Sequence, residues 1–423
     1  MWNEMQGAQK VTGFFGHDAP WIYIMISATQ KFIQLQRRYH MNSRKVKKIA
    51  AILCVATLAA GSMSGCGGTS SSGTSSASGS AAKTSSSSDG TFKKSDSVET
   101  VLKAAAAAGS IGDWGNGEQY EILALLNKYG INVSSSDLLN QGFDMSGFDD
   151  GSIMLASAMS YNELGLIKNS YDGAYGYGDK IGTIDFNKEG ISMVEDNLVC
   201  TRDFAEKNPN TVKAFIYGTI QGWKYASEHP DEAAQIVADA GSTLSEDHQK
   251  YMAEEMAKLA STKIDGSEVD NYCEMYDDAL QQTLDISQKY IKLDDSTAQD
   301  ALSKMTLDTF RDPSYYNDAK DKNFGTPEKK NVTIQLKWLA QSQFMGYYVA
   351  LDKGYYKDAG LDVTITPGGG DISEITQVNS GQADFASSWT VQTITADAGG
   401  MDLIEVAQPT ESAGMTMIYK LSD

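Results

Sequence analysis

Hydrophobic and polar positions follow three different patterns along the chain. Residues 109–198 mix short apolar runs with turn signals, which predicts short strands and helices, including a helix from Glu118 to Lys128. Between Thr201 and Phe310 apolar residues recur every three or four positions, the spacing of helices packed on a core. Residues 332–423 alternate strand, helix, strand, helix and strand, with the first of these helices predicted over 344–357. This last pattern predicts a parallel sheet with right-handed crossovers.

Residues 311–331 lack any such pattern. They are polar, hold two prolines and show no hydrophobic period, so they are predicted to be a linker between the helical segment 201–310 and the segment 332–423.

The first ninety residues have the layout of an exported and tethered protein. Residues 41–65 carry basic residues and then a short apolar run, which is typical of a secretory signal and short for a membrane span. The run ends in MSGC, which resembles the bacterial lipobox, and Cys66 would carry the lipid. An ordinary signal peptide with an incidental cysteine is the alternative. Residues 66–92 are rich in Ser, Gly and Thr and predict a flexible tether. Residues 1–40 are interpreted as an upstream extension from a misassigned start.

Composition narrows the classes of function. The net charge of −20 argues against nucleic acid as a partner. Cys200 and Cys273 lie in amphipathic patterns and are expected to be buried and free, with a disulfide between them as the alternative. The four histidines and four cysteines form no metal-binding spacing, and no nucleophile elbow is present. We therefore expect neither a catalytic constellation nor a cofactor.

Candidate binding residues follow the predicted strands of 332–423, because ligands of parallel sheets lie at the carboxyl ends of the strands. Trp338 offers a flat face for a ring, with a core tryptophan as the alternative. The Gly-rich turn before Asp371 presents backbone N–H groups, although Asp371 is also a plausible helix N-cap. The candidates in this segment are Lys337, Trp338, Gln343, Tyr347, Tyr348, Gly368, Gly369, Asp371, Ser387 and Trp389.

The motif LKWLAQSQFMGYYVALDKGYYKDAGLDVTITPGGGD, followed by SGQADFA, resembles the first lobe of the SsuA-like and thiamine-pyrimidine-precursor-like substrate-binding proteins of ABC transporters. Residues 93–200 resemble the second lobe of that family, and 201–310 resemble its return into the first lobe. Tyr161, Asn162 and Glu163 match the ligand-facing segment of the second lobe, where Glu163 would accept hydrogen bonds from an aminopyrimidine.

The two halves occur in the reverse of the family's order. The resemblance therefore implies an α/β, type 2 periplasmic-binding-protein-like two-lobe fold that is circularly permuted, with 332–423 as the first-lobe segment. A tandem protein that lost parts of both copies is the alternative. A permuted chain is expected to pair strands of 332–423 with strands near 181–195 within one molecule.

The function implied by the resemblance is that of an extracytoplasmic lipoprotein that is not an enzyme. It would bind a small heteroaromatic nutrient, first of all a thiamine pyrimidine precursor, and deliver it to the permease of an ABC importer at the cell membrane. Riboflavin or an alkanesulfonate are the alternative ligands. A thiamine-pyrimidine synthesis enzyme and a non-functional product of a rearranged gene are the competing interpretations. The enzyme branch carries a cysteine-rich motif and a histidine, whereas residues 331–423 contain neither residue type, and Phe344 occupies the histidine position of another branch.

Overall fold

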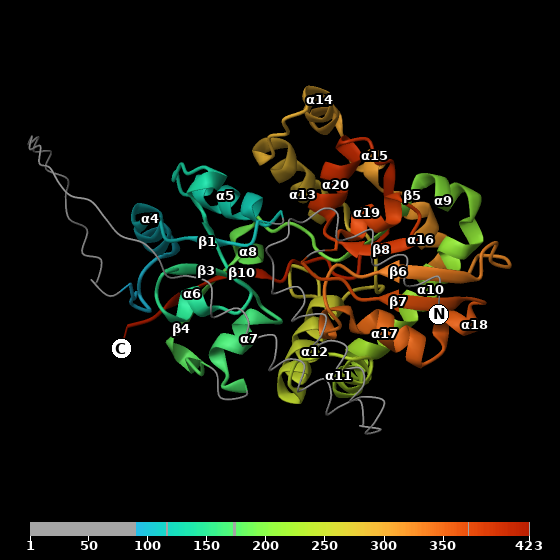
Figure 1. Ribbon diagram of the computed structural model, residues 1–423, viewed down its shortest axis with the longest axis horizontal. Helices are drawn as coiled ribbons and strands as arrows, with labels where there is room; N and C mark the ends of the chain where they lie inside the picture. The colour runs from blue at the N-terminus through green and yellow to red at the C-terminus, as the bar shows by residue number, and fades with distance from the viewer. Residues whose placement is uncertain (1–89, 116, 172–174, 371, 423) are drawn as a thin grey trace, which may run out of the picture. The chain divides into compact units, whose positions relative to one another are not determined.

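The computed structural model describes residues 90–115, 117–171, 175–370 and 372–422 (Figure 1). The predictions for the signal segment, for Cys66 and for nearly all of the tether lie outside these residues. Within the described ranges, no helix combines the length and apolar character that a membrane crossing requires.

The larger sheet has five strands in the order β7-β6-β8-β5-β9. Its members are β5 (Asn197–Thr201), β6 (Asn331–Gln335), β7 (Asp362–Thr366), β8 (Phe385–Ser388) and β9 (Leu403–Ala407). β6 is parallel to β7 and β8, as the strand–helix alternation predicts, but β5 is antiparallel to both of its neighbours. The strands that 332–423 contributes to this sheet run parallel to one another, as predicted, and the antiparallel member β5 comes from an earlier segment of the chain.

The smaller sheet combines strands from both ends of the described chain. β10 (Met415–Lys420) lies between β3 (Leu155–Met159) and β4 (Ile181–Asp185) and is antiparallel to both. The expected pairing of the C-terminal segment with strands near 181–195 is therefore observed. A separate parallel pair joins β1 (Gly112–Asp113) to β2 (Leu139–Asn140). The helices that accompany these strands are α4 (Val98–Ala108), α5 (Gln119–Lys128), α6 (Ser146–Asp149), α7 (Glu163–Lys168) and α8 (Phe186–Glu189).

We call the β3-β10-β4 sheet with β1, β2 and α4 to α8 the second lobe, and the five-stranded sheet with its helices the first lobe. Two segments, 191–196 and 408–414, connect them. The first-lobe helices are α9 (Arg202–Lys207), α10 (Pro209–Glu228), α11 (Pro230–Asp239), α12 (Glu246–Ser261), α13 (Asp277–Tyr290), α14 (Ser296–Lys304), α15 (Leu307–Phe310), α16 (Pro313–Lys320), α17 (Met345–Asp352), α18 (Tyr355–Asp358), α19 (Glu374–Asn379) and α20 (Thr390–Ala398). Helices lie on either side of this sheet (Figure 1). The mixed α/β architecture is compatible with a periplasmic-binding-protein-like fold.

α10 is central to the first-lobe core. Trp223 is fully buried on this helix, and Phe215 stacks between Tyr356 and Phe385 at ring-centroid distances of 4.8 and 4.2 Å. α10 also approaches α17 closely, since a Cβ atom at Gly222 would lie 2.1 Å from the carbonyl oxygen of Gly346. The glycine is needed for this helix contact.

Two sequence predictions in this region need correction. The predicted linker 311–331 contains α16, whose first turn is capped by the Asp312 carboxylate, which accepts a hydrogen bond from the Ser314 N–H at 2.9 Å. Tyr316 and Ala319 are its buried residues, and two buried positions in eight leave no visible period. The single helix predicted for 344–357 is divided into α17 and α18, because Gly354 adopts a φ of 79°.

Both ends of the described chain lie side by side in the second lobe. Phe92 bridges to Leu421 in parallel, with the Phe92 N–H donating to the Lys420 carbonyl at 2.9 Å and the Ser422 N–H donating to the Phe92 carbonyl at 2.7 Å. The Phe92 ring also meets the Tyr419 ring edge-on at 5.4 Å.

Candidate functional site

A cavity of about 700 Å³ is lined by residues of both lobes. The first lobe contributes residues that directly follow three strands: Lys337 and Trp338 after β6, Gly369 after β7 and Trp389 after β8. The second lobe contributes the segment after β3 and the segment after β1. Strand ends thus position the walls, as expected for a sheet with parallel strands.

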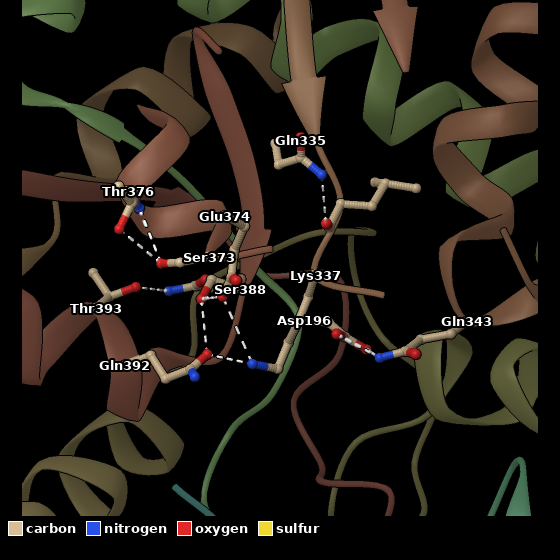
Figure 2. A network of polar contacts seen from close by, with 12 residues as sticks. Asp196, Gln335, Lys337, Gln343, Ser373, Glu374, Thr376, Ser388, Gln392 and Thr393 are labelled. Carbon is tan, nitrogen blue, oxygen red and sulfur yellow. Dashed lines mark hydrogen bonds and ion pairs between the residues drawn. The ribbon is translucent and has the colours of Figure 1, made fainter. Parts of the chain in front are cut away.

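Lys337 lies on the cavity wall and has polar and aromatic partners, of which Figure 2 shows the polar ones. Its Nζ donates a hydrogen bond to Gln392 Oε1 and lies 3.6 Å from a carboxylate oxygen of Glu374. It also lies 4.5 Å from the ring centroid of Trp389. The side chains of Lys337 and Glu374 are only 11% and 6% exposed, so solvent screens this pair weakly. The positive charge of Lys337 is compensated from within the protein.

Glu374 has a second partner in this network. The Ser388 hydroxyl, at the end of β8, donates to Glu374 Oε1 at 2.5 Å and reaches Gln392 Oε1 at 3.2 Å. Glu374 opens α19 and Gln392 lies in the first turn of α20, so two helix N-termini and a strand end meet at this point. The sequence could have indicated Glu374 and Gln392 as site residues, because both lie shortly after the ends of predicted strands.

Behind this wall, Asp196 lies in the connection between the lobes. The amide of Gln343 donates to both of its carboxylate oxygens, at 2.8 and 3.0 Å. Burial raises the pKa of Asp196 to about 7, although the Gln343 hydrogen bonds and the charge of Lys337 oppose the rise. Asp196 thereby fixes Gln343, which does line the cavity.

The second lobe supplies buried carboxyl groups. Glu163 is 6% exposed, and burial raises its pKa to about 7. Its two oxygens accept from the Met159 N–H at 2.9 Å and from the Asn162 side-chain amide at 2.7 Å. A ligand would therefore share Glu163 with partners inside the protein. Glu118, which is 3% exposed, is a further acidic residue of the wall.

Aromatic rings form the outer wall of the cavity and bridge the lobes. The ring of Phe143 stacks on Trp114 at 6.0 Å and meets Trp338 at 4.7 Å. Phe143 and Trp114 belong to the second lobe and Trp338 to the first. Sequence reasoning missed Trp114 and Phe143. Trp114 directly follows the short strand β1 and could be found by the strand-end rule that selects Trp338, whereas Phe143 lies in a loop that gives no such signal.

The structure brings eight of the predicted site residues to the cavity wall. These are Tyr161, Asn162, Glu163, Lys337, Trp338, Gln343, Gly369 and Trp389. Asp371 lies outside the described residues.

Four further candidates in the described ranges do not line the cavity: Tyr347, Tyr348, Gly368 and Ser387. Tyr347 is 1% exposed and packs edge-on against Trp223, because α17 lies against α10. The Gly368 N–H donates to the Trp338 carbonyl at 2.7 Å, and a Cβ atom at this glycine would lie 2.2 Å from the Leu336 carbonyl oxygen. Gly368 thus holds the backbone of the wall residue Trp338, whereas Tyr347 belongs to the core between α10 and α17.

A family model described as NMT1/THI5 like matches residues 107–233 and 341–423. These two segments are similar to the NMT1/THI5-like family, which includes solute-binding proteins of ABC transporters as well as pyrimidine synthases. A comparison with curated proteins found no match to the chain.

Proposed function

We propose that this protein is a solute-binding component of an ABC importer and that its ligand is a small, flat heteroaromatic nutrient bearing an amino group. A thiamine pyrimidine precursor is the ligand that fits this description first. The proposal follows the transport branch of the NMT1/THI5-like family, and its ligand class follows from the chemistry of the cavity wall.

The main support for this ligand class is that aromatic rings and carboxyl groups line the same cavity. Trp338 and Trp389 both line the cavity, and stacking of a flat ligand on an aromatic side chain contributes about 1–3 kcal/mol. Among the described lining residues three carboxyl groups face one ammonium group, that of Lys337. Buried carboxylates accept hydrogen bonds from amines, so this balance favours an amino-bearing or cationic ligand.

The same balance disfavours an alkanesulfonate. A free cation favours an anionic head group, whereas Lys337 is already paired with Glu374 and hydrogen-bonded to Gln392. The described lining residues also include neither a histidine nor a cysteine, the residue types that mark the enzyme branch. These observations favour binding and transport as the function.

We further propose that the chain is a functional circular permutation of the family's fold. Two observations support this order: β10 pairs with β3 and β4, and β5 enters the sheet formed by β6 to β9. Phe92 and Leu421 are also adjacent, so residues from the two ends of the described chain meet in one lobe, as a permuted order allows. Residues 41–66 are proposed to direct export and to attach the protein through Cys66 to the extracytoplasmic face of the cell membrane, beside a permease.

Calorimetry and thermal unfolding test the ligand class. We expect an aminopyrimidine to bind and an alkanesulfonate not to bind. A ligand present at 100 times its dissociation constant adds about 2.7 kcal/mol to the free energy of unfolding. Riboflavin serves as the second ring ligand. Binding of the sulfonate alone would contradict the proposal, and turnover of a bound pyrimidine precursor with iron would favour the synthase branch.

A further inference from the structure

The cavity is larger than a single substituted ring requires. A ring with about ten non-hydrogen atoms fills less than about 300 Å³, even if each atom is given the volume of a water molecule in the liquid. The cavity measures about 700 Å³, which is within the range of pockets that hold drug-sized ligands. More than half of the space therefore remains after a ring is placed between the tryptophans.

This space continues along one face of α20. Gln392, Thr395, Ala396 and Gly399 all line the cavity, and their spacing of three, four and seven residues places them on one side of the helix. At a rise of 1.5 Å per residue, the stretch from Gln392 to Gly399 is about 10 Å long. We call this part of the cavity the α20 arm.

The α20 arm has an apolar floor and hydroxyl groups beside it. Ile375, in the first turn of α19, and Met401, beyond the end of α20, also line the cavity and belong to one apolar cluster together with Ala396. Thr395 Oγ1 donates to the Val391 carbonyl at 2.6 Å, which leaves its oxygen able to accept a further hydrogen bond.

Gln392 lies in the first turn of α20, at the end of the arm nearest Trp389. Its Oε1 already accepts from Lys337 Nζ and from the Ser388 hydroxyl, which fixes the orientation of the amide (Figure 2). Its Nε2 makes no hydrogen bond to another described residue. The amide therefore presents N–H donors to the cavity, where they suit an acceptor atom close to the point at which a substituent joins a ring.

We propose that the α20 arm is a second subsite, which takes a flexible substituent of about 10 Å carried by the ring ligand, with Gln392 Nε2 donating to an acceptor near the junction. The substituent class is an alkyl or hydroxyalkyl chain, because the floor is apolar and Thr395 contributes a hydroxyl group on the same helix face. This inference rests on the proposed function, since the ring must lie between the tryptophans.

A series of aminopyrimidines with no chain, an n-propyl, an n-hexyl or an n-dodecyl chain tests the arm by calorimetry. Burial of each methylene group should tighten binding about three- to fourfold. We expect the gain to continue through the hexyl chain and to end before dodecyl, which is longer than the arm. Binding of the bare ring with no gain from any chain would overturn the arm and leave the proposed function intact. Failure of the bare ring and of every chain-bearing ring would overturn both.

Ala396→Leu identifies where the chain binds. We expect this variant to lose at least tenfold of the gain from the hexyl chain, because the larger side chain fills the arm. Asn379→Leu, which adds an apolar side chain to an exposed position of α19 outside the cavity, should keep the full gain. Thermal unfolding without ligand establishes that both variants fold, and Ala396→Val replaces Ala396→Leu if the latter does not. Equal hexyl affinity for the wild type and a folded Ala396 variant would overturn the assignment.

Discussion

Glu195→Gln should make the protein less stable than the wild type at acidic pH and more stable at alkaline pH. Glu195 lies in the connection between the lobes and is 5% exposed. Its two oxygens accept from the backbone N–H groups of Gly414, at 3.1 Å, and Met415, at 3.2 Å, in the other connection and at the start of β10. Burial, with the neighbouring Asp196 charge, raises the pKa of Glu195 from 4.5 to about 8.

The magnitude follows from the linkage between protonation and folding. Below pH 4.5 the carboxyl group is protonated in both the folded and the unfolded state, so it imposes no ionisation penalty. As pH rises toward 8 the unfolded chain ionises first, and the free energy of unfolding falls by up to about 5 kcal/mol, at 1.36 kcal/mol per pH unit. A glutamine at this position cannot ionise and avoids that loss. It presents only one acceptor to two backbone donors, which costs about 1–3 kcal/mol at every pH.

Urea unfolding followed by tryptophan fluorescence at about pH 4, 7 and 9 measures this difference. Glu195→Gln should be less stable than the wild type by about 1–3 kcal/mol at the acidic end. It should be more stable by about 2–4 kcal/mol at the alkaline end, where the avoided ionisation outweighs the lost acceptor. Glu206→Gln, at an exposed position of α9, is the matched control and should follow the wild type throughout. A constant difference between Glu195→Gln and the wild type across this range would refute the reasoning.

Three further predictions concern packing, ligand affinity and anchoring. Gly222→Ala should lower the free energy of unfolding by about 1–3 kcal/mol despite the better helix propensity of alanine, because the new Cβ meets the backbone of α17; unchanged stability in urea would argue against the close helix contact. Trp338→Ala should weaken binding of an aminopyrimidine by about 1–3 kcal/mol, as measured by calorimetry, and full retention of affinity would remove this ring from the site. Cys66→Ala should release the protein from the membrane fraction into the soluble one, because the lipid would be its lasting anchor. Retention of that variant in the membrane pellet would point to a different attachment.

The local pattern of hydrophobic and polar residues predicted many of the strands and helices. Alternation predicted the strands β6 to β9, and helical spacing predicted the helical segment 201–310 that contains α9 to α15, because side-chain burial on one face follows directly from the period of the backbone. The strand-end rule likewise led to Lys337, Trp338 and Trp389, since a residue after a parallel strand reaches the same edge of the sheet as its neighbours. Short elements with few buried positions, such as α16, carried too little pattern to be predicted.

Only the tertiary structure decided which segments pair and which side chains share the cavity. The insertion of β5 between β8 and β9, and of β10 between β3 and β4, depends on contacts across two hundred residues that leave no local period. Tyr347 and Trp338 are both aromatic and lie nine residues apart, yet packing of α17 on α10 buries the first and leaves the second on the cavity wall. The raised pKa of Glu195 has the same origin, because desolvation is set by the atoms that the fold brings around a carboxyl group and not by its neighbours in sequence.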